Sequence, residues 1–248
     1  MGESGEGVSA CASVTAALDA CDLVLLPVPL SRDGRTLWAP ALSSPPTLSD
    51  ILAHTPSHAR IFGGGELDDA RFFDYASRPD FAQANAIPTA EGALLLAMQK
   101  LSCTVSGARV GVVGFGRVGK AVAALFRAAG ARVTVFARRT EVCAVASVLG
   151  YCAAPLSELC HRARELTCLI NTVPSPVIGH EPLCVMTPSA LVLELASEPY
   201  GVDFEAARTF GVQAVLARAL PGRFSPETAG YAIAHTVLTM LCESGLSF

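Results

Sequence analysis

A glycine-rich turn between an apolar strand and a helix is the feature that most constrains the fold of this chain. The glycines follow the predicted strand 109–113 in the spacing GxGxxG and open a predicted helix over residues 117–129. In such a turn the first glycine permits tight turning, the second lets a pyrophosphate approach the backbone, and the third lets the helix pack closely on the strand. We therefore predict a dinucleotide-binding turn; a glycine-rich turn without a ligand is the alternative. The residues assigned to the cofactor here are Gly114, Phe115, Gly116, Arg117, Val118 and Gly119.

Strand-like and helix-like segments alternate along the middle of the chain, at intervals of about 20 residues, as in βαβ units on a parallel sheet. The sequence therefore predicts an α/β protein with a Rossmann-type doubly wound parallel sheet and a second, smaller α/β domain. Strands are predicted at 109–113, 132–136, 151–153, 167–171, 190–195 and 212–216, and helices at 117–129, 141–149, 156–164 and 204–210.

Two domains are expected in the 248 residues. The N-terminal α/β domain takes residues 1–87, and the NAD(P)-binding domain takes residues 88–223. The second domain begins with a linker helix, residues 88–101, because proline and acidic residues are favoured in the first turn of a helix. No strand follows the last predicted helix, residues 226–242, so we expect this helix to return to the first domain. The strands predicted in the first domain are residues 22–26 and 60–62.

Composition and charge exclude several classes of protein. Hydrophobic residues make up 51% of the chain and charged residues 16%, which is typical of globular proteins and not of disordered ones. The 18 basic and 22 acidic side chains give a net charge of −4 without a basic stripe, so no nucleic-acid partner is expected. No apolar run reaches the roughly 18 residues that a membrane span needs, so no membrane association is expected.

The N-terminal residues and the cysteines bear on location and on metal binding. Residues 1–11 contain acidic but no basic side chains and do not look like a secretory signal, so we expect a cytoplasmic protein. The nine cysteines include no CxxC pair. We therefore expect reduced, mostly buried thiols and no metal site.

Two arginines stand where NAD-binding domains usually carry an acidic residue. That acidic residue, at the end of the second strand, accepts the ribose 2′-hydroxyl of NAD, whereas guanidinium groups suit the 2′-phosphate of NADP. Here the second strand leads into Arg138, Arg139 and Thr140, which we assign to the cofactor. We expect NADP, with NAD as the alternative; the arginines could instead be a solvated pair that begins the next helix.

The loops after the fourth and sixth predicted strands are expected at the ligand-binding edge of the sheet, because ligands bind at the carboxyl ends of such strands. We assign Asn171, Thr172, Val173 and Pro174 of the first loop to the cofactor. Gly222 of the second loop is assigned to it as well. An Asn-Thr-x-Pro segment also serves as an ordinary turn, and this alternative stays open.

Five ordered motifs carry a resemblance to a known family. They are Asn85–Gly92, the glycine turn Gly114–Gly119, Ile170–Ser175, Leu195–Phe204 and Leu220–Gly230. Together they resemble the family of dipicolinate synthase A subunits. The resemblance implies the last step of dipicolinic acid formation, from a dihydrodipicolinate-type intermediate of the lysine pathway, in the mother cell of a sporulating bacterium. It also implies a partner, the flavoprotein-like B subunit of dipicolinate synthase.

The chain departs from that family's pattern at several positions. The family opens with a strand and a glycine turn that residues 1–18 lack, so we expect a chain shortened by one βα unit, through a short gene model or a real loss. A sheet edge exposed in this way favours association, so we expect an oligomer. Tyr200 replaces a glycine, Glu227 replaces a basic residue, and Arg218-Ala219 replace Pro-Gly.

The chemistry that the resemblance implies is hydride transfer from a dihydropyridine dicarboxylate to the nicotinamide, with proton loss and aromatisation. Such an enzyme needs an oriented substrate, cationic partners for two carboxylates, and a base. Glu91 is the candidate for the base or for a structural support of the cleft; the alternative is that Glu91 is only an acid in the first turn of its helix, where it interacts with the helix dipole. Arg223 is the candidate carboxylate partner, and Asn85 is a third catalytic candidate. We expect the active site in a cleft between the two domains, lined by Asn85, Glu91, Asn171, Thr172 and Gly222.

Other kinds of protein fit parts of the pattern. A shikimate-dehydrogenase-like or 2-hydroxyacid-dehydrogenase-like oxidoreductase shares the Asn-Thr-x-Pro loop or the linker helix. A hydroxyacid dehydrogenase would carry a set of Arg, Glu and His, and we find no convincing set in this sequence. A non-catalytic subunit that binds a nucleotide for assembly is the alternative outside enzymes.

Overall fold

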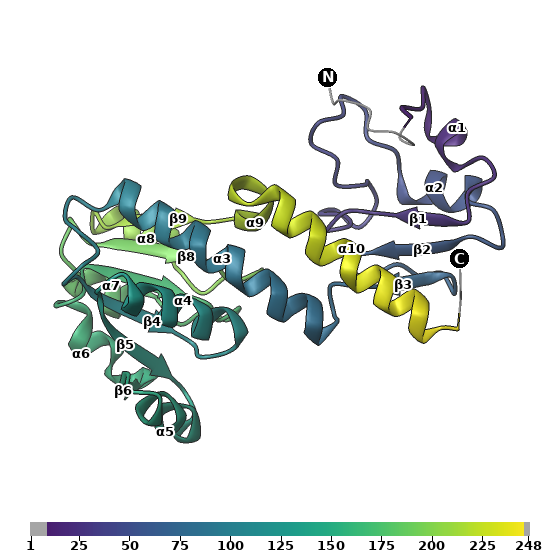
Figure 1. Ribbon diagram of the computed structural model, residues 1–248. Coiled ribbons are helices and arrows are strands. Elements are labelled where there is room, and N and C mark those ends of the chain that lie inside the picture. The colour runs from purple at the N-terminus through teal and green to yellow at the C-terminus, as the bar shows by residue number, and fades with distance from the viewer. Residues whose placement is uncertain (1–8, 246–248) are drawn as a thin grey trace. The chain divides into compact units, whose positions relative to one another are not determined.

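The computed structural model describes residues 9–245 and divides into two compact units (Figure 1). One unit comprises Met1–Ala82 with Ile233–Phe248, and the other comprises Gln83–Ala232. The cytoplasmic location that we expect from residues 1–11 rests largely on residues 1–8, which lie outside the described part of the chain.

The larger unit contains a six-stranded parallel sheet in the order β6-β5-β4-β7-β8-β9. Its strands are β4 (Arg109–Val113), β5 (Arg132–Ala137), β6 (Cys152–Pro155), β7 (Cys168–Asn171), β8 (Leu191–Glu194) and β9 (Gln213–Leu216). Each of the six predicted strands is present, with ends shifted by at most two residues, and the fold class is confirmed. The chain moves outward from β4 in both directions, so the strand order reverses between β4 and β7. The carboxyl ends of these two strands form the switch point where ligands of such sheets bind.

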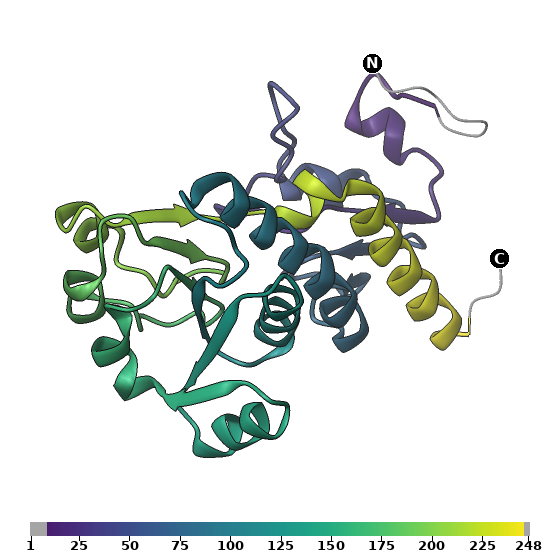
Figure 2. The ribbon, with the colours of Figure 1, turned by 60° about the vertical axis from the view of Figure 1, so that its left-hand side comes forward.

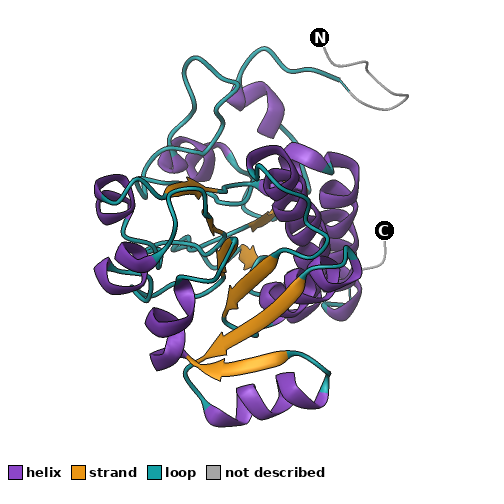
Figure 3. Ribbon diagram, turned by 90° about the vertical axis from the view of Figure 1, so that its left-hand side faces the viewer, coloured by secondary structure: helices purple, strands orange, loops and turns teal. Residues whose placement is uncertain are grey.

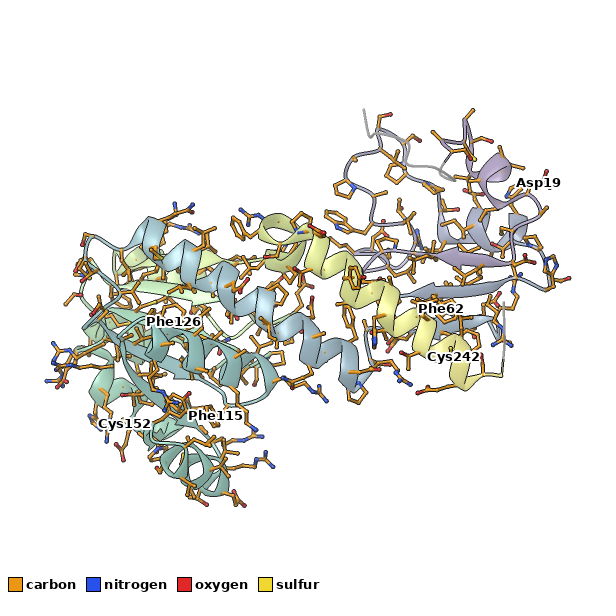
Figure 4. The ribbon with its side chains drawn as sticks, in the orientation of Figure 1. Asp19, Phe62, Phe115, Phe126, Cys152 and Cys242 are labelled. Carbon is orange, nitrogen blue, oxygen red and sulfur yellow. The ribbon has the colours of Figure 1, made fainter. Side chains whose placement is uncertain are left out.

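Helices cover both faces of this sheet (Figure 3). Because side chains alternate along a strand, Val110 and Val112 of β4 face one core and Val113 faces the other. Phe126, which is fully buried, fills the first core (Figure 4). Residues of α3 (Pro79–Lys100), α4 (Arg117–Ala128) and α5 (Thr140–Val148) pack in the first core. Residues of η1 (Leu156–Glu158), α6 (Leu159–Ala163), α7 (His180–Val185) and α8 (Phe204–Thr209) pack in the second.

The helix predicted to begin at residue 88 begins at Pro79, and this prediction is wrong in its start. Pro88 lies inside α3, where it has no N–H to donate to the carbonyl of Ala84. The hydroxyl of the next residue, Thr89, donates to the carbonyl oxygen of Asn85 at 2.7 Å. Pro88 is buried, so packing holds the helix through a residue that usually marks a helix start.

The smaller unit is built on a three-stranded parallel sheet in the order β1-β2-β3. Its strands are β1 (Leu23–Leu25), β2 (Arg60–Gly63) and β3 (Phe72–Asp74), and its helices include α1 (Val14–Leu18) and α2 (Leu48–His54). Thr47 and Asp50 form a capping box at the start of α2. The sequence pattern missed β3 because it has three residues, all half-buried, and so lacks an alternating pattern.

The last two helices within residues 9–245 are α9 (Leu220–Phe224) and α10 (Pro226–Glu243) (Figure 2). Arg78 donates to Glu243 at 2.7 Å, so an ion pair joins the last residue of α10 to the residue before α3. Both residues belong to the smaller unit. No helix within residues 9–245 is long and apolar enough to cross a membrane.

The cysteines differ from the expectation that they are mostly buried. Cys168 of β7 is buried, and burial raises the pKa of its thiol, whereas five of the nine cysteines are exposed. The other three have intermediate exposure. Cys168 lies on a central strand of the larger sheet. The exposed cysteines lie on helices, in loops and on an edge strand, where neighbouring elements do not cover them. Within residues 9–245, no three His, Cys, Asp or Glu side chains form a group that could hold a metal ion.

Candidate functional site

The glycine turn between β4 and α4 has three glycines with three different surroundings. Gly114 has φ +91°, a left-handed conformation that favours glycine, and a Cβ atom there would lie 2.6 Å from Oγ1 of Thr172. A Cβ atom on Gly119 would lie 2.3 Å from the carbonyl oxygen of Gly114. A Cβ atom on Gly116 would meet no atom within 4 Å. The turn is therefore closed around Gly114 and Gly119 and open at Gly116, where the N-terminus of α4 faces free space.

A cavity of about 430 Å³ lies beside this turn at the carboxyl ends of β4, β5 and β7. Its position is the switch point of the sheet, and its walls come from the glycine turn, the end of β5 and the loop after β7. The lining residues are Val113, Gly114, Phe115, Gly116, Phe136, Ala137, Arg138, Arg139, Val142, Leu156, Thr172, Val173, Pro174, Ser175 and Val177.

Arg138 and Arg139 both line the cavity at the end of β5. Both side chains are exposed, and no carboxylate within residues 9–245 pairs with either guanidinium group. Thr140 begins α5 and is not among the lining residues. The site therefore presents two unpaired cations to any anion that enters it.

The loop after β7 forms the opposite wall of the cavity. Thr172, Val173 and Pro174 line it, and the Thr172 hydroxyl donates to the carbonyl oxygen of Val113 at 2.8 Å. Asn171 does not line the cavity: its side chain is fully buried, and its amide nitrogen donates to Glu194 at 2.8 Å. Thr172 thus lies at the cavity wall, whereas Asn171, which the sequence analysis also assigned to the cofactor, lies behind the wall.

Glu194 is the residue that the sequence pattern missed. It ends β8 and its carboxylate is buried, with 1% of the residue exposed. The signal available in the sequence is an acidic residue at the end of an otherwise apolar strand, beside an asparagine at the end of the neighbouring strand.

Three predicted residues of the glycine turn, Arg117, Val118 and Gly119, do not line the cavity. Arg117 is the first residue of α4 and is exposed, and Val118 packs against the first core. Phe115 lines the cavity from one side and packs edge-to-face on Tyr151, with ring centroids 5.6 Å apart.

Glu91 and Asn85 lie on α3. Glu91 is exposed and lines a second hollow of about 360 Å³ together with Ile87, Ala121 and other residues of α3 and α4, two helices that lie side by side (Figure 1, Figure 2). Because α3 begins at Pro79, Glu91 lies in the middle of the helix, and the interpretation as a first-turn acid is wrong. Neither residue lines the cavity at the glycine turn.

Gly222 and Arg223 lie on α9 and do not line that cavity either. A Cβ atom on Gly222 would meet no atom within 4 Å. The guanidinium group of Arg223 lies 5.0 Å from the ring centroid of Phe224, and no carboxylate within residues 9–245 pairs with it. Arg223 is thus an available cation outside the cavity.

The loops after β8 and β9 are joined by a polar contact. The phenol of Tyr200 donates to Glu198 at 2.7 Å and accepts a hydrogen bond from Arg218. Burial and the bond to Glu198 raise the pKa of Tyr200. Tyr200 (φ +59°) and Ala219 (φ +53°) both adopt the left-handed conformation that favours glycine, so both loops are held in a strained form.

Comparison with known proteins assigns a class to this fold and cavity. The family model of the NAD-binding domain of D-isomer-specific 2-hydroxyacid dehydrogenases matches residues 89–197. The chain is therefore an oxidoreductase of the NAD-binding dehydrogenase type, with a nicotinamide cofactor. The open approach at Gly116 and the two unpaired arginines fit such an anionic dinucleotide.

More similar relatives narrow the class to one family. The A subunit of dipicolinate synthase from Bacillus subtilis (strain 168) is 37% identical over 205 residues, which is 78% of this chain and 68% of that protein. The chain belongs to the family of dipicolinate synthase A subunits, and the resemblance in its sequence motifs is confirmed.

Solved structures agree with this assignment. The crystal structure of the dipicolinate synthase A subunit from Bacillus halodurans is 31% identical with a TM-score of 0.82, over 90% of this chain and 80% of that one. The corresponding dipicolinate synthase structure from Bacillus subtilis is 34% identical with a TM-score of 0.79, over 91% and 79%. A transhydrogenase from Sinorhizobium meliloti, 16% identical with a TM-score of 0.72 over 92% and 75%, shares the fold alone.

Proposed function

We propose that this protein oxidises a dihydropyridine dicarboxylate of the dihydrodipicolinate type to dipicolinate. The observation that supports the proposal is a cavity beside the glycine turn, with no atom within 4 Å of a Cβ position on Gly116, in a chain of the dipicolinate synthase A-subunit family. The glycine turn, Arg138 and Arg139 would hold a nicotinamide dinucleotide, which would supply the acceptor for the hydride that the substrate ring loses. One proton leaves the ring at the same time, so that an aromatic pyridine, the reduced cofactor and a proton are formed. Aromatisation supplies the driving force, and the protein orients the substrate.

We propose NADP as the preferred cofactor. Arg138 and Arg139 line the cavity at the end of β5 and lack carboxylate partners among the described residues, so both can bind a 2′-phosphate. None of the residues that line the cavity is acidic, so none of them can accept a ribose 2′-hydroxyl as the acid of NAD-binding domains does.

We propose Glu91 as the base that takes the proton, Arg223 as a carboxylate partner and Asn85 as a substrate-orienting group. The exposure of Glu91 and the unpaired guanidinium of Arg223 leave both side chains available to a ligand. We also propose the functional division at residues 87 and 88, with a cofactor-binding part at 88–223 and an N-terminal part completed by 226–242.

The proposed partner is the B subunit of dipicolinate synthase, because the relatives are named as the A subunit of a synthase. The proposed place of action is the cytoplasm of the mother cell of a sporulating bacterium. An oligomer is proposed as well.

The test is an assay of NADP reduction by absorbance with dihydrodipicolinate-type intermediates of the lysine pathway, with and without the B subunit. We expect dipicolinate and NADPH in equal amounts, and more of both when the B subunit is present. Tight NADP binding without turnover under both conditions would instead support a non-catalytic assembly subunit. Turnover of a 2-hydroxy acid would support a hydroxyacid dehydrogenase.

A further inference from the structure

The buried carboxylate of Glu194 gathers hydrogen bonds from three separate parts of the larger unit. Its Oε2 atom accepts from the backbone N–H of Gly201 at 2.7 Å and of Val202 at 2.9 Å. Its Oε1 atom accepts from the N–H of Ala196 at 2.9 Å, and both oxygens accept from the Asn171 amide. None of the ion pairs within residues 9–245 includes Glu194. Oriented N–H groups therefore compensate this buried charge.

One set of contacts leads from Glu194 to the near end of the cavity wall. The amide nitrogen of Asn171 donates both to Glu194 and to the carbonyl oxygen of Val173 at 2.9 Å. The amide oxygen of Asn171 accepts from the N–H of Val173 at 3.1 Å. Val173 lines the cavity and, with Thr172, occupies the space that a Cβ atom on Gly114 would need. Glu194 thus holds the start of the wall against the glycine turn.

A second set of contacts leads from Glu194 to the far end of the same wall. Gly201, whose N–H binds Glu194, accepts at its carbonyl oxygen from the N–H groups of Val177 at 3.1 Å and Ile178 at 2.8 Å. Val202, which also binds Glu194, pairs with Ile178 in a parallel bridge. Val177 lines the cavity. The segment 172–177 is therefore fixed at both ends by one carboxylate that does not itself line the cavity.

The packing is tight at Gly201, where the loop after β8 meets the wall segment. A Cβ atom on Gly201 would lie 2.3 Å from the amide nitrogen of Asn171 and 2.8 Å from the carbonyl oxygen of Ser175. The loop after β8 therefore approaches the wall closely, at backbone level. A small displacement of Glu194 or its donors must move the wall segment, because densely packed interiors transmit strain.

We propose that Glu194 is a positioning residue for the dinucleotide cavity, which it shapes by holding both ends of segment 172–177. The proposal rests on the proposed function in one respect, namely that this cavity takes a nicotinamide dinucleotide. A carboxylate is suited to this role because two acceptor oxygens serve three N–H groups and one amide. A glutamine has one acceptor oxygen, so its NH₂ group would face N–H donors and leave them unsatisfied.

The experiment compares Glu194→Gln with the wild type and with Leu191→Ala. Leu191 is fully buried at the opposite end of the same strand, so its variant reports the effect of destabilising the sheet away from the cavity. Thermal unfolding is measured for all three proteins, and dissociation constants for NADP and NAD are measured by fluorescence titration. We expect Glu194→Gln to weaken binding of the preferred nucleotide at least tenfold, and Leu191→Ala to leave it within about twofold at a temperature where each protein is folded.

Turnover separates positioning from a general loss of structure. We expect the KM for the cofactor to rise in Glu194→Gln while kcat at saturating cofactor changes much less. If Glu194→Gln does not fold, Asn171→Ala is measured instead, because it cuts the link to Val173 and leaves the three backbone donors of Glu194 in place. The same rise in KM is expected for it.

The outcomes distinguish this proposal from the proposed function. Wild-type affinity in a folded Glu194→Gln protein, or in Asn171→Ala where that variant is measured, overturns the positioning role. Equal loss of affinity in Glu194→Gln and Leu191→Ala also overturns it, since the effect would then follow stability alone. If the wild type binds neither NADP nor NAD, the proposed function fails before the variants are compared.

Discussion

Gly119 approaches Gly114 so closely that a Cβ atom on Gly119 would lie 2.3 Å from the carbonyl oxygen of Gly114. A Cβ atom on Gly116, which lies between them in the sequence, would have no other atom within 4 Å. The three glycines of one motif therefore separate into two that the protein needs for its own packing and one that leaves space for a ligand.

This separation predicts opposite phenotypes for two small substitutions. Gly119→Ala forces the first turn of α4 away from β4 and should destabilise the protein by roughly 1–3 kcal/mol. Gly116→Ala should leave the melting temperature nearly unchanged and weaken nucleotide binding at least tenfold, because its methyl group projects where the pyrophosphate approaches the backbone. Thermal unfolding and nucleotide titration of both variants test this. Nucleotide binding of wild-type strength in Gly116→Ala would contradict the prediction that the pyrophosphate binds at this turn.

A charge reversal at the end of β5 should change the cofactor preference. We expect the wild type to prefer NADP over NAD at least tenfold, because each charge-assisted hydrogen bond is worth about 1.5–3 kcal/mol. Arg138→Asp should erase this preference, mainly by weakening NADP. The control is Arg164→Asp, an exposed arginine of the larger unit outside the cavity, which carries the same charge change. Equal NADP and NAD affinities in the wild type would contradict the NADP assignment.

Substitution of the proposed base should affect turnover more than cofactor binding. Glu91 lies on α3 and does not line the nucleotide cavity, so Glu91→Gln should leave the NADP affinity within about twofold. Its turnover should fall by about 10²–10⁴-fold if this carboxylate takes the proton. Steady-state rates with NADP and the dihydrodipicolinate-type substrate measure the effect. A variant with wild-type turnover would show that Glu91 is not the base and is only a surface residue of α3.

The ion pair between Arg71 and Asp69 should contribute to the acid stability of the smaller unit. Arg71 donates to Asp69 and to the carbonyl oxygens of Thr55 and Pro56, and its bonds to Asp69 lower the pKa of that carboxyl to about 2. Because the pKa of Asp69 is lower in the folded protein than its ordinary value of about 4, the stabilisation by this ion pair is complete above about pH 4. It is lost as the pH falls through about 2. Asp69→Asn should therefore lower the melting temperature at pH 7 by a few degrees. Between pH 4 and 2 the melting temperature of this variant should fall less steeply than that of the wild type.

The neighbouring residue supplies the control for the acid prediction. Asp68 is exposed, and no hydrogen bond or ion pair of its side chain is found in the described structure. Asp68→Asn should leave the melting temperature and its pH dependence unchanged. Identical pH profiles for Asp69→Asn and the wild type would show that the Arg71 pair contributes nothing to acid stability.

Local patterns in the sequence were sufficient to predict the main sheet. The apolar runs that became β4 to β9 are separated by helical segments, and right-handed crossovers between parallel strands leave few ways to order them. The glycine turn and Arg138-Arg139 could also be placed at the ligand edge, because both directly follow strands of this sheet. These features depend on neighbours in sequence, so the sequence by itself determined them.

Other features depended on contacts between segments that are distant in sequence. The start of α3 was missed because the packing of buried Pro88 overrides the usual position of proline in a helix. The burial of Asn171 and the role of Glu194 could not be predicted. A carboxylate at the end of an apolar strand usually reaches solvent, and it is buried here because a loop folds back and supplies the N–H groups of Gly201 and Val202. Only the tertiary structure decides this, since burying a charge is tolerable only when its hydrogen-bond donors are already held in place around it.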